Sequence, residues 1–122
     1  MLERLAEIVN GNEDLVRRGR YFSDTFMLEV GETQYLIEVL QGRIESVELG
    51  PFVMRSWTFA LRATEDVWHR FWEKLPKPGY HDIFALLRQN RIVLDGDLQP
   101  MMANLLYVKE VIAAPRKLKV ME

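Results

Sequence analysis

Residues 21–63 decide the fold, and they read YFSDTFMLEVGETQYLIEVLQGRIESVELGPFVMRSWTFALRA. Gly31, Gly42 and Gly50 divide this stretch into four runs in which apolar residues alternate with polar ones. Runs of this kind, separated by turns that contain glycine, are typical of short antiparallel strands. The third run slips by one residue, which indicates a β-bulge. We therefore predict a four-strand meander whose alternating apolar residues are Phe26, Leu28 and Val30, then Tyr35, Ile37 and Val39, then Ile44, Val47 and Leu49, and last Val53, Trp57, Phe59 and Leu61, with Arg55 interrupting the fourth run.

Helical segments flank the predicted strands. Residues 1–11 have the apolar spacing of an amphipathic helix, and the polar residues 12–20 are expected to form a linker. After the strands, Thr64 can cap a helix that continues to Leu75 and ends before Pro76. A short helix over 82–90, a strand over 91–95 and a helix over 98–114 are expected to follow. This order predicts an α+β domain with its helices gathered on one face of the sheet.

Length and composition narrow the class of protein. The chain has 122 residues, 48% of them hydrophobic, which predicts one domain over 1–122, with a helix and linker over 1–19 and a tail over 115–122. The absence of cysteine excludes a disulfide scaffold and a thiolate nucleophile. The formal net charge of −2 argues against a nucleic-acid partner. No apolar run is long enough for a membrane span or a signal peptide, so we expect a cytoplasmic protein without stable membrane insertion.

Residues able to carry out catalysis are few. None of the serines lies in a Gly-x-Ser-x-Gly turn. His81 adjoins Asp82, but Asp82 is well placed to cap the helix that follows, and an acid–base role of His81 stays open as the alternative. Asp95 and Asp97 flank Gly96 as in a calcium loop, yet the later ligand positions hold leucine, glutamine and proline, so a turn and a helix cap are expected there. We therefore expect no enzyme activity, no cofactor and no metal.

The most informative feature is a surplus of large apolar side chains in the helical half. It includes Trp68 and Trp72 in one helix and the pair Met101 and Met102 in the last one. Such side chains suit either an irregular core or a pocket whose walls adapt to a flexible apolar ligand. The last helix is apolar almost all round, which indicates full burial or an interface with a partner.

Lys109 falls inside the apolar arc of that last helix. Three interpretations remain open: the side chain extends to water along its stem, it pairs with an internal glutamate, or it faces a cavity and meets an anionic head group. Two basic clusters, over residues 17–20 and 116–119, are interpreted as solvated surface. A weak attraction of these clusters to an anionic lipid surface is the alternative.

A resemblance to a known family rests mainly on the stretch Asn90-Arg91-Ile92-Val93-Leu94-Asp95-Gly96-Asp97 and on Met101-Met102-Ala103-Asn104-Leu105-Leu106. These resemble the strand and the following apolar helix of the sterol carrier protein 2-like family, although Asn90 stands where the family has glycine. Thr64-Glu65-Asp66-Val67-Trp68 is similar to the opening of the family's central helix, and Gly42-Arg43-Ile44-Glu45-Ser46-Val47 to its turn into the third strand. The resemblance covers residues 20–113.

The resemblance implies a five-stranded, mostly antiparallel sheet with helices packed on one face and a hydrophobic tunnel between them. It also implies non-enzymatic binding or carriage of a hydrophobic ligand, such as a fatty acid, an acyl-CoA, a sterol or a similar lipid. We hypothesise that Lys109 orients a carboxylate of that ligand. The alternative is a ligand-free accessory protein that forms a homodimer or binds a partner enzyme through the last helix. The expected ligand-binding residues are Trp57, Phe59, Trp68, Phe71, Trp72, Phe84, Leu87, Met101, Met102, Leu105, Leu106 and Lys109.

Overall fold

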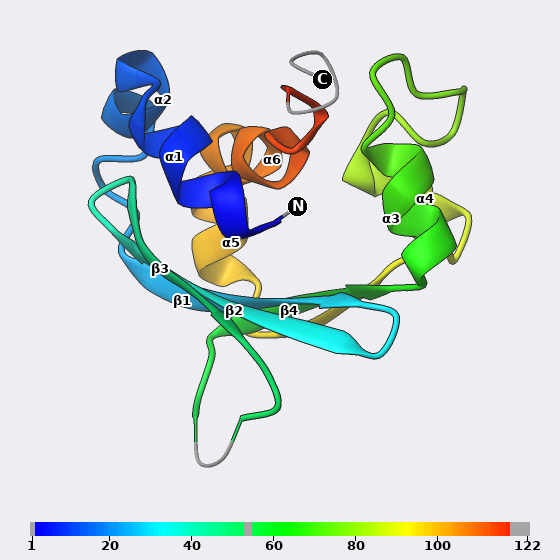
Figure 1. The fold of residues 1–122 in the computed structure, drawn as a ribbon, viewed down its shortest axis with the longest axis horizontal. Coiled ribbons are helices and arrows are strands. Elements are labelled where there is room, and N and C mark those ends of the chain that lie inside the picture. Colours follow the sequence, from blue (N-terminus) through cyan, green and yellow to red (C-terminus); the bar gives the residue numbers. More distant parts are fainter. Residues whose placement is uncertain (1, 53–54, 118–122) are drawn as a thin grey trace.

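The computed structural model describes residues 2–52 and 55–117. The sheet forms one layer and the helices lie on one side of it, as predicted (Figure 1). In chain order the elements are a 3-10 helix (Leu2–Arg4), α1 (Leu5–Asn10), α2 (Glu13–Arg18), β1 (Asp24–Val30), β2 (Thr33–Leu40), β3 (Arg43–Leu49), β4 (Phe59–Ala63), α3 (Glu65–Phe71), α4 (Ile83–Arg88), β5 (Val93–Gly96), α5 (Gln99–Ala103) and α6 (Leu105–Ala113).

The five strands lie in the order β3-β2-β1-β4-β5. The pair β1–β4 is parallel and the other three pairs are antiparallel, which confirms a mostly antiparallel five-stranded sheet. The four-strand meander is wrong in its last step, because β4 pairs with β1 and not with β3. The reason lies in β1, where Phe26, Met27 and Leu28 are all buried. A strand with both faces buried needs a hydrogen-bonded neighbour on each side, and β4 supplies the second one.

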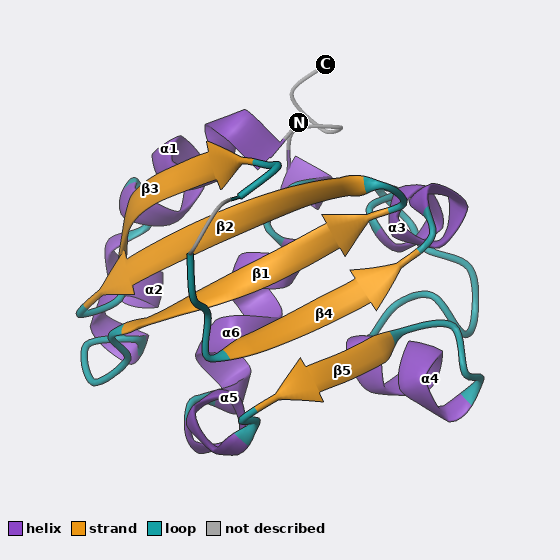
Figure 2. Ribbon diagram, turned by 90° about the horizontal axis from the view of Figure 1, so that it is seen from below, coloured by secondary structure: helices purple, strands orange, loops and turns teal. Residues whose placement is uncertain are grey.

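The connection from β3 to β4 crosses the outer face of the sheet (Figure 2). Its residues Phe52 and Trp57 pack there on a small buried cluster formed by Met27, Leu36 and Ala60. Trp57 therefore lies on the face opposite to Phe59, and the prediction that the two share one face is wrong. Strand alternation does not extend to Trp57, because β4 begins only at Phe59. Val53, predicted on the same face, lies outside the described residues.

The predicted β-bulge is confirmed in β3. Glu38 pairs with Ser46 and Val39 pairs with Ile44, which makes Glu45 the extra residue. The side-chain amide of Asn10 in α1 donates to the Ile44 carbonyl at 3.0 Å and accepts from the Ile44 N–H at 2.8 Å. Asn10 thus takes the place of a strand partner and protects this edge of the sheet.

The N-terminal segment is more helical than the sequence indicates. The helix predicted over 1–11 is confirmed by the 3-10 turn and α1, but residues 12–20 contain α2 and are not simply a linker. The side chain of Asn12 caps α2 by accepting a hydrogen bond from the Leu15 N–H at 3.2 Å. Leu15 is buried, so contact with the rest of the fold stabilises a helix of only six residues.

Two other helices are shorter than predicted. α3 ends at Phe71, and Leu75 is 83% exposed. Pro76 disfavours helical backbone at Leu75 and offers no N–H to the Trp72 carbonyl, so the last turn of the predicted helix is weakened. The last helix is divided at Asn104 into α5 and α6. The Asn104 side chain donates back to the Pro100 carbonyl at 3.0 Å, a local hydrogen bond that competes with continuous helix.

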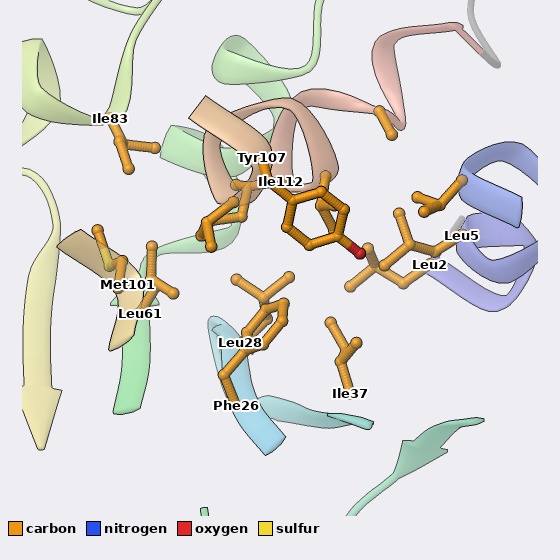
Figure 3. Packing of buried hydrophobic residues seen from close by; sticks show 14 of the residues in the cluster. Leu2, Leu5, Phe26, Leu28, Ile37, Leu61, Ile83, Met101, Tyr107 and Ile112 are labelled. Atoms are coloured by element: carbon orange, nitrogen blue, oxygen red, sulfur yellow. The ribbon is translucent and has the colours of Figure 1, made fainter. Parts of the chain in front are cut away.

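The helices and the inner face of the sheet share one hydrophobic core (Figure 3). Tyr107 points into it from α6, and its hydroxyl donates to the Gly42 carbonyl at 2.7 Å in the turn between β2 and β3. Gly19 lies against the ring, since a Cβ at Gly19 would come within 2.3 Å of it. Gly42 has a φ of +82°, which favours glycine. This junction therefore joins the helix layer to the sheet.

Replacing Tyr107 with phenylalanine leaves the buried Gly42 carbonyl without its donor. We expect the free energy of unfolding to fall by about 1–2 kcal/mol at neutral pH, measured by urea denaturation. The matched control is Tyr21→Phe on an exposed tyrosine, which should change it by less than about 0.5 kcal/mol. Equal losses in the two variants would contradict the role of the junction.

The difference in stability between the wild type and Tyr107→Phe should depend on pH. Burial raises the pKa of Tyr107 above its usual value of 10.0. Above about pH 10 the unfolded chain therefore loses a proton that the folded chain keeps, and folding becomes less favourable. We expect the stability advantage of the wild type over Tyr107→Phe to shrink as pH rises through about 10 to 11 in urea titrations. An advantage that stays constant over this range would contradict the buried, protonated phenol.

Candidate functional site

The interior between sheet and helices is occupied by two tryptophans. Trp68 and Trp72 are buried and stack with their ring centroids 5.1 Å apart. The Trp68 Nε1–H donates to the Glu29 carbonyl at 2.8 Å, and the Trp72 Nε1–H donates to the Ile112 carbonyl at 2.9 Å. Because both indole N–H groups have backbone partners, these hydrogen bonds hold the rings in place between β1 and α6. The two side chains thus form core where a tunnel was expected.

The remaining expected ligand-binding residues lie in different environments. Those buried in the core are Phe59, Phe71 and Met101. Those partly buried are Phe84, Leu105 and Lys109. Those exposed are Leu87, Met102 and Leu106, and Trp57 lies on the outer face of the sheet. Phe71, Leu106 and Lys109 meet around one pocket, and Met102, Leu105 and Leu106 line a neighbouring groove.

This pocket lies where α6 faces the end of α3 and the start of α4, and we call it the Lys109 pocket. Its volume is about 290 Å³. The apolar residues that line it are Phe71, Ile83, Leu106 and Ala113. The polar residues that line it are His81, Asp82, Lys109, Glu110 and Arg116. An apolar hollow with a few charged groups at its border suits a ligand that has an apolar body and a polar end.

Lys109 is paired with an acid, which is one of the three interpretations that its position allowed. Its Nζ lies 3.1 Å from both carboxylate oxygens of Asp82 and donates a hydrogen bond to Oδ2. The partner is an aspartate from the start of α4 and not a glutamate. The expectation that the Asp82 side chain caps α4 is wrong, because that side chain makes no capping hydrogen bond. Both side chains are about 30% exposed or less, so the attraction between their opposite charges is stronger than it would be between fully exposed side chains.

Lys109 also contacts an aromatic ring. Its Nζ lies 5.3 Å from the ring centroid of Phe84, within the range of a cation–π interaction. Phe84 belongs to α4, so the ammonium is held by two groups of the same helix region. Lys109 therefore connects α6 to the first turn of α4.

Arg116 was interpreted as solvated surface, and the structure shows a different role. Its guanidinium donates to the carbonyl of Phe71 at 2.6 Å, to that of His81 at 3.0 Å and to that of Tyr80 at 3.4 Å. It also lies 4.4 Å from the ring centroid of Phe71. Burial lowers the pKa of Arg116, and the charge of Asp82 opposes that shift. Sequence spacing does not reveal this role, because all three acceptors are distant backbone carbonyls. Lys119 of the same cluster lies outside the described residues.

A second groove, of about 440 Å³, follows α5 and the start of α6. Tyr21 and Leu106 border it and are 80% and 70% exposed. Arg18 and Arg20 also line it; Arg18 pairs with Glu110 of α6, and the Arg20 guanidinium lies 4.6 Å from the Tyr21 ring centroid. The last helix is therefore buried on one side only. Its apolar surface near Leu106 continues from this groove to the Lys109 pocket, which Leu106 also lines.

The turn at Asp95 and Asp97 has the structure expected of a turn and helix cap. The Asp95 side chain accepts from the Gly96 N–H at 2.9 Å, and the Asp97 side chain accepts from the Gln99 N–H at 3.1 Å. Over residues 2–52 and 55–117, no group of three or more histidine, aspartate or glutamate side chains is arranged to hold a metal ion. Within the same ranges, no helix has the length and hydropathy of a membrane span.

Comparison with known proteins rests on structure. No protein-family model matches the sequence, and no curated protein sequence matches it. Solved structures do match. A crystal structure of sterol carrier protein 2 superposes with a TM-score of 0.73 at 12% identity, over 93% of this chain and 91% of that chain. The chain has the sterol carrier protein 2 fold.

Two further structures share the sterol carrier protein 2 fold. A conserved protein of Thermus thermophilus, named as a candidate sterol carrier protein, has a TM-score of 0.67 at 11% identity, over 93% of this chain and 84% of that one. The UbiJ-SCP2 ubiquinone synthesis protein has a TM-score of 0.59 at 13% identity, over 95% and 88%. The superpositions establish the fold, and at that level they confirm the resemblance found in the sequence.

The hydrogen-bonded tryptophan pair is expected to be a main source of stability. Replacing Trp72 with phenylalanine removes ring volume and leaves the Ile112 carbonyl without its donor, so the free energy of unfolding should fall by about 2–4 kcal/mol. Trp57→Phe on the outer face is the control and should cost about 1 kcal/mol, measured by urea denaturation. A larger loss of unfolding free energy in Trp57→Phe than in Trp72→Phe would contradict the role of Trp72 in the core.

Proposed function

We propose that this chain is a non-enzymatic binding protein that holds an apolar ligand with a small polar end in the Lys109 pocket. The observation that carries the proposal is that one hollow combines four apolar side chains with the Lys109–Asp82 pair. The apolar walls stabilise the complex by roughly 25 cal/mol per Å² of surface removed from water. The charged pair supplies hydrogen bonds that orient the polar end.

The fold neighbours support this class of ligand. Their names refer to sterols and to ubiquinone, which are largely apolar molecules with a ring system. The size of the pocket agrees with a ring system, since an apolar cavity of about 150 Å³ holds one benzene. At about 290 Å³ the Lys109 pocket accommodates roughly two fused rings. A longer ligand would continue over the exposed Leu106.

The histidines support binding without catalysis. His81 lines the pocket, but the neighbouring Asp82 is engaged by Lys109 and is not paired with the imidazole. His69 pairs with Glu65 at 3.4 Å, and both side chains are more than half exposed on the surface of α3. Neither histidine forms an acid–base pair directed into the Lys109 pocket. The proposal keeps the cytoplasmic location that the sequence led us to expect.

A substitution that fills the Lys109 pocket should weaken ligand binding. Ala113 lines the Lys109 pocket and is only partly buried, so Ala113→Phe places a ring in the hollow without removing a core contact. We expect it to weaken binding of naphthalene, a two-ring probe, at least about tenfold by titration calorimetry. Ala103→Phe, which lines the other groove, is the matched control and should leave the affinity unchanged. If Ala103→Phe is the variant that weakens binding, the site is misplaced.

A second candidate function is self-association through α5 and α6. The observation that favours it is the exposure of Tyr21 and Leu106 beside Arg18 and Arg20, since tyrosine and arginine are enriched in protein interfaces. If this function holds, Tyr21→Ser should shift a dimer to monomer in analytical ultracentrifugation by raising the dissociation constant about tenfold or more. A wild type that is monomeric at high concentration would exclude it.

A further inference from the structure

The Lys109–Asp82 pair restricts which polar group a ligand of this pocket can carry. We propose that the Lys109 pocket selects a neutral hydroxyl group, an alcohol or a phenol, over a carboxylate, with Asp82 Oδ1 as the hydrogen-bond acceptor. This inference rests on the proposed function, because it specifies the ligand of the same pocket. It replaces the hypothesis that Lys109 orients a carboxylate.

The first observation is an unused acceptor. Asp82 Oδ1 is buried and makes no hydrogen bond to the described part of the chain. The Lys109 ammonium lies 3.1 Å from it but directs its hydrogen bond to Oδ2. A buried carboxylate oxygen without a donor is costly, and a ligand that supplies a donor removes that cost. A hydroxyl is such a donor, whereas an ionised carboxylate has none.

The second observation is the charge balance around the pocket. The charge of Lys109 is already compensated by Asp82, and Glu110 is paired with Arg18. Arg116 directs its Nε and Nη2 groups to three backbone carbonyls and not to the Lys109–Asp82 pair. An incoming carboxylate at Asp82 Oδ1 would lie directly against the Asp82 charge, and like charges at short distance repel. A neutral hydroxyl avoids this repulsion.

The third observation is that a hydroxyl suits both members of the pair. It can donate to Asp82 Oδ1 and at the same time accept from Lys109 Nζ, which has three donors and uses one on Oδ2. Lys109 is 31% exposed, so its long side chain has room to turn aside and admit the hydroxyl next to Oδ1. The apolar body of the ligand then lies on Phe71 and Ile83.

Three probes with the same rings test this inference: 2-naphthol, 2-naphthoate and 2-methylnaphthalene. Their dissociation constants are measured at pH 7 with the full chain, where the naphthol is neutral and the naphthoate is ionised. We expect 2-naphthol to bind at least about tenfold more tightly than either of the others, because it gains a charge-assisted hydrogen bond. Tighter binding of 2-naphthoate by the wild type would overturn the inference without the need for any variant.

Asp82→Asn identifies the acceptor. This variant leaves Lys109 uncompensated, so the preference for 2-naphthol over 2-naphthoate should disappear or reverse. The matched control is Asp66→Asn, which breaks the exposed pair with Arg70 on α3 and should keep the preference. Circular dichroism verifies that each variant is folded. An unchanged preference in folded Asp82→Asn would overturn the inference.

The outcomes separate this inference from the proposed function. If 2-methylnaphthalene binds as tightly as 2-naphthol, the pocket stands and recognition of the hydroxyl is refuted. If none of the three probes binds, the proposed function fails, and the inference fails with it.

Discussion

The anchoring of Trp68 and Trp72 is the constraint on which the rest of the structure depends. Each indole N–H is bound to a backbone carbonyl, one in β1 and one in α6, so the two rings fix the distance between sheet and helices. Because the rings are stacked and buried, the chain itself fills the space between β1 and α6. The Lys109 pocket lies outside this filled region, between the helices.

Two cations of the C-terminal part hold the border of that pocket. Lys109 binds the side chain of Asp82, and Arg116 binds backbone carbonyls at the end of α3 and in the connection between α3 and α4. These contacts join α6 and the residues just after it to a segment that has little regular structure of its own. The groups that shape the pocket are thus also the groups that keep the α3–α4 connection against the core. Asp82 therefore both borders the pocket and helps to hold this connection in place.

Local features of the fold could be predicted where neighbouring residues decide them. Alternation located the inward faces of β1 and β2, and the slip in spacing placed a bulge in the third run, where Glu45 is the extra residue. Thr64 caps α3 as predicted, by accepting from the Val67 N–H. Features that depend on distant contacts were not predicted correctly. The partner of β4 depends on the burial of β1 from both sides, and α2 depends on a buried Leu15. Neither condition is visible in the segment itself.

The sequence by itself determined the α+β class, the placement of the helices on one face of the sheet, and the unusual position of Lys109 within an apolar arc. These follow from periodicity, because a side chain's direction repeats along a helix or a strand. Only the tertiary structure decided that the tryptophans are core and that Trp57 belongs to the outer face. It also decided that Lys109 meets Asp82. The physical reason is that these contacts join residues far apart in the chain, and periodicity carries no information on which distant faces meet.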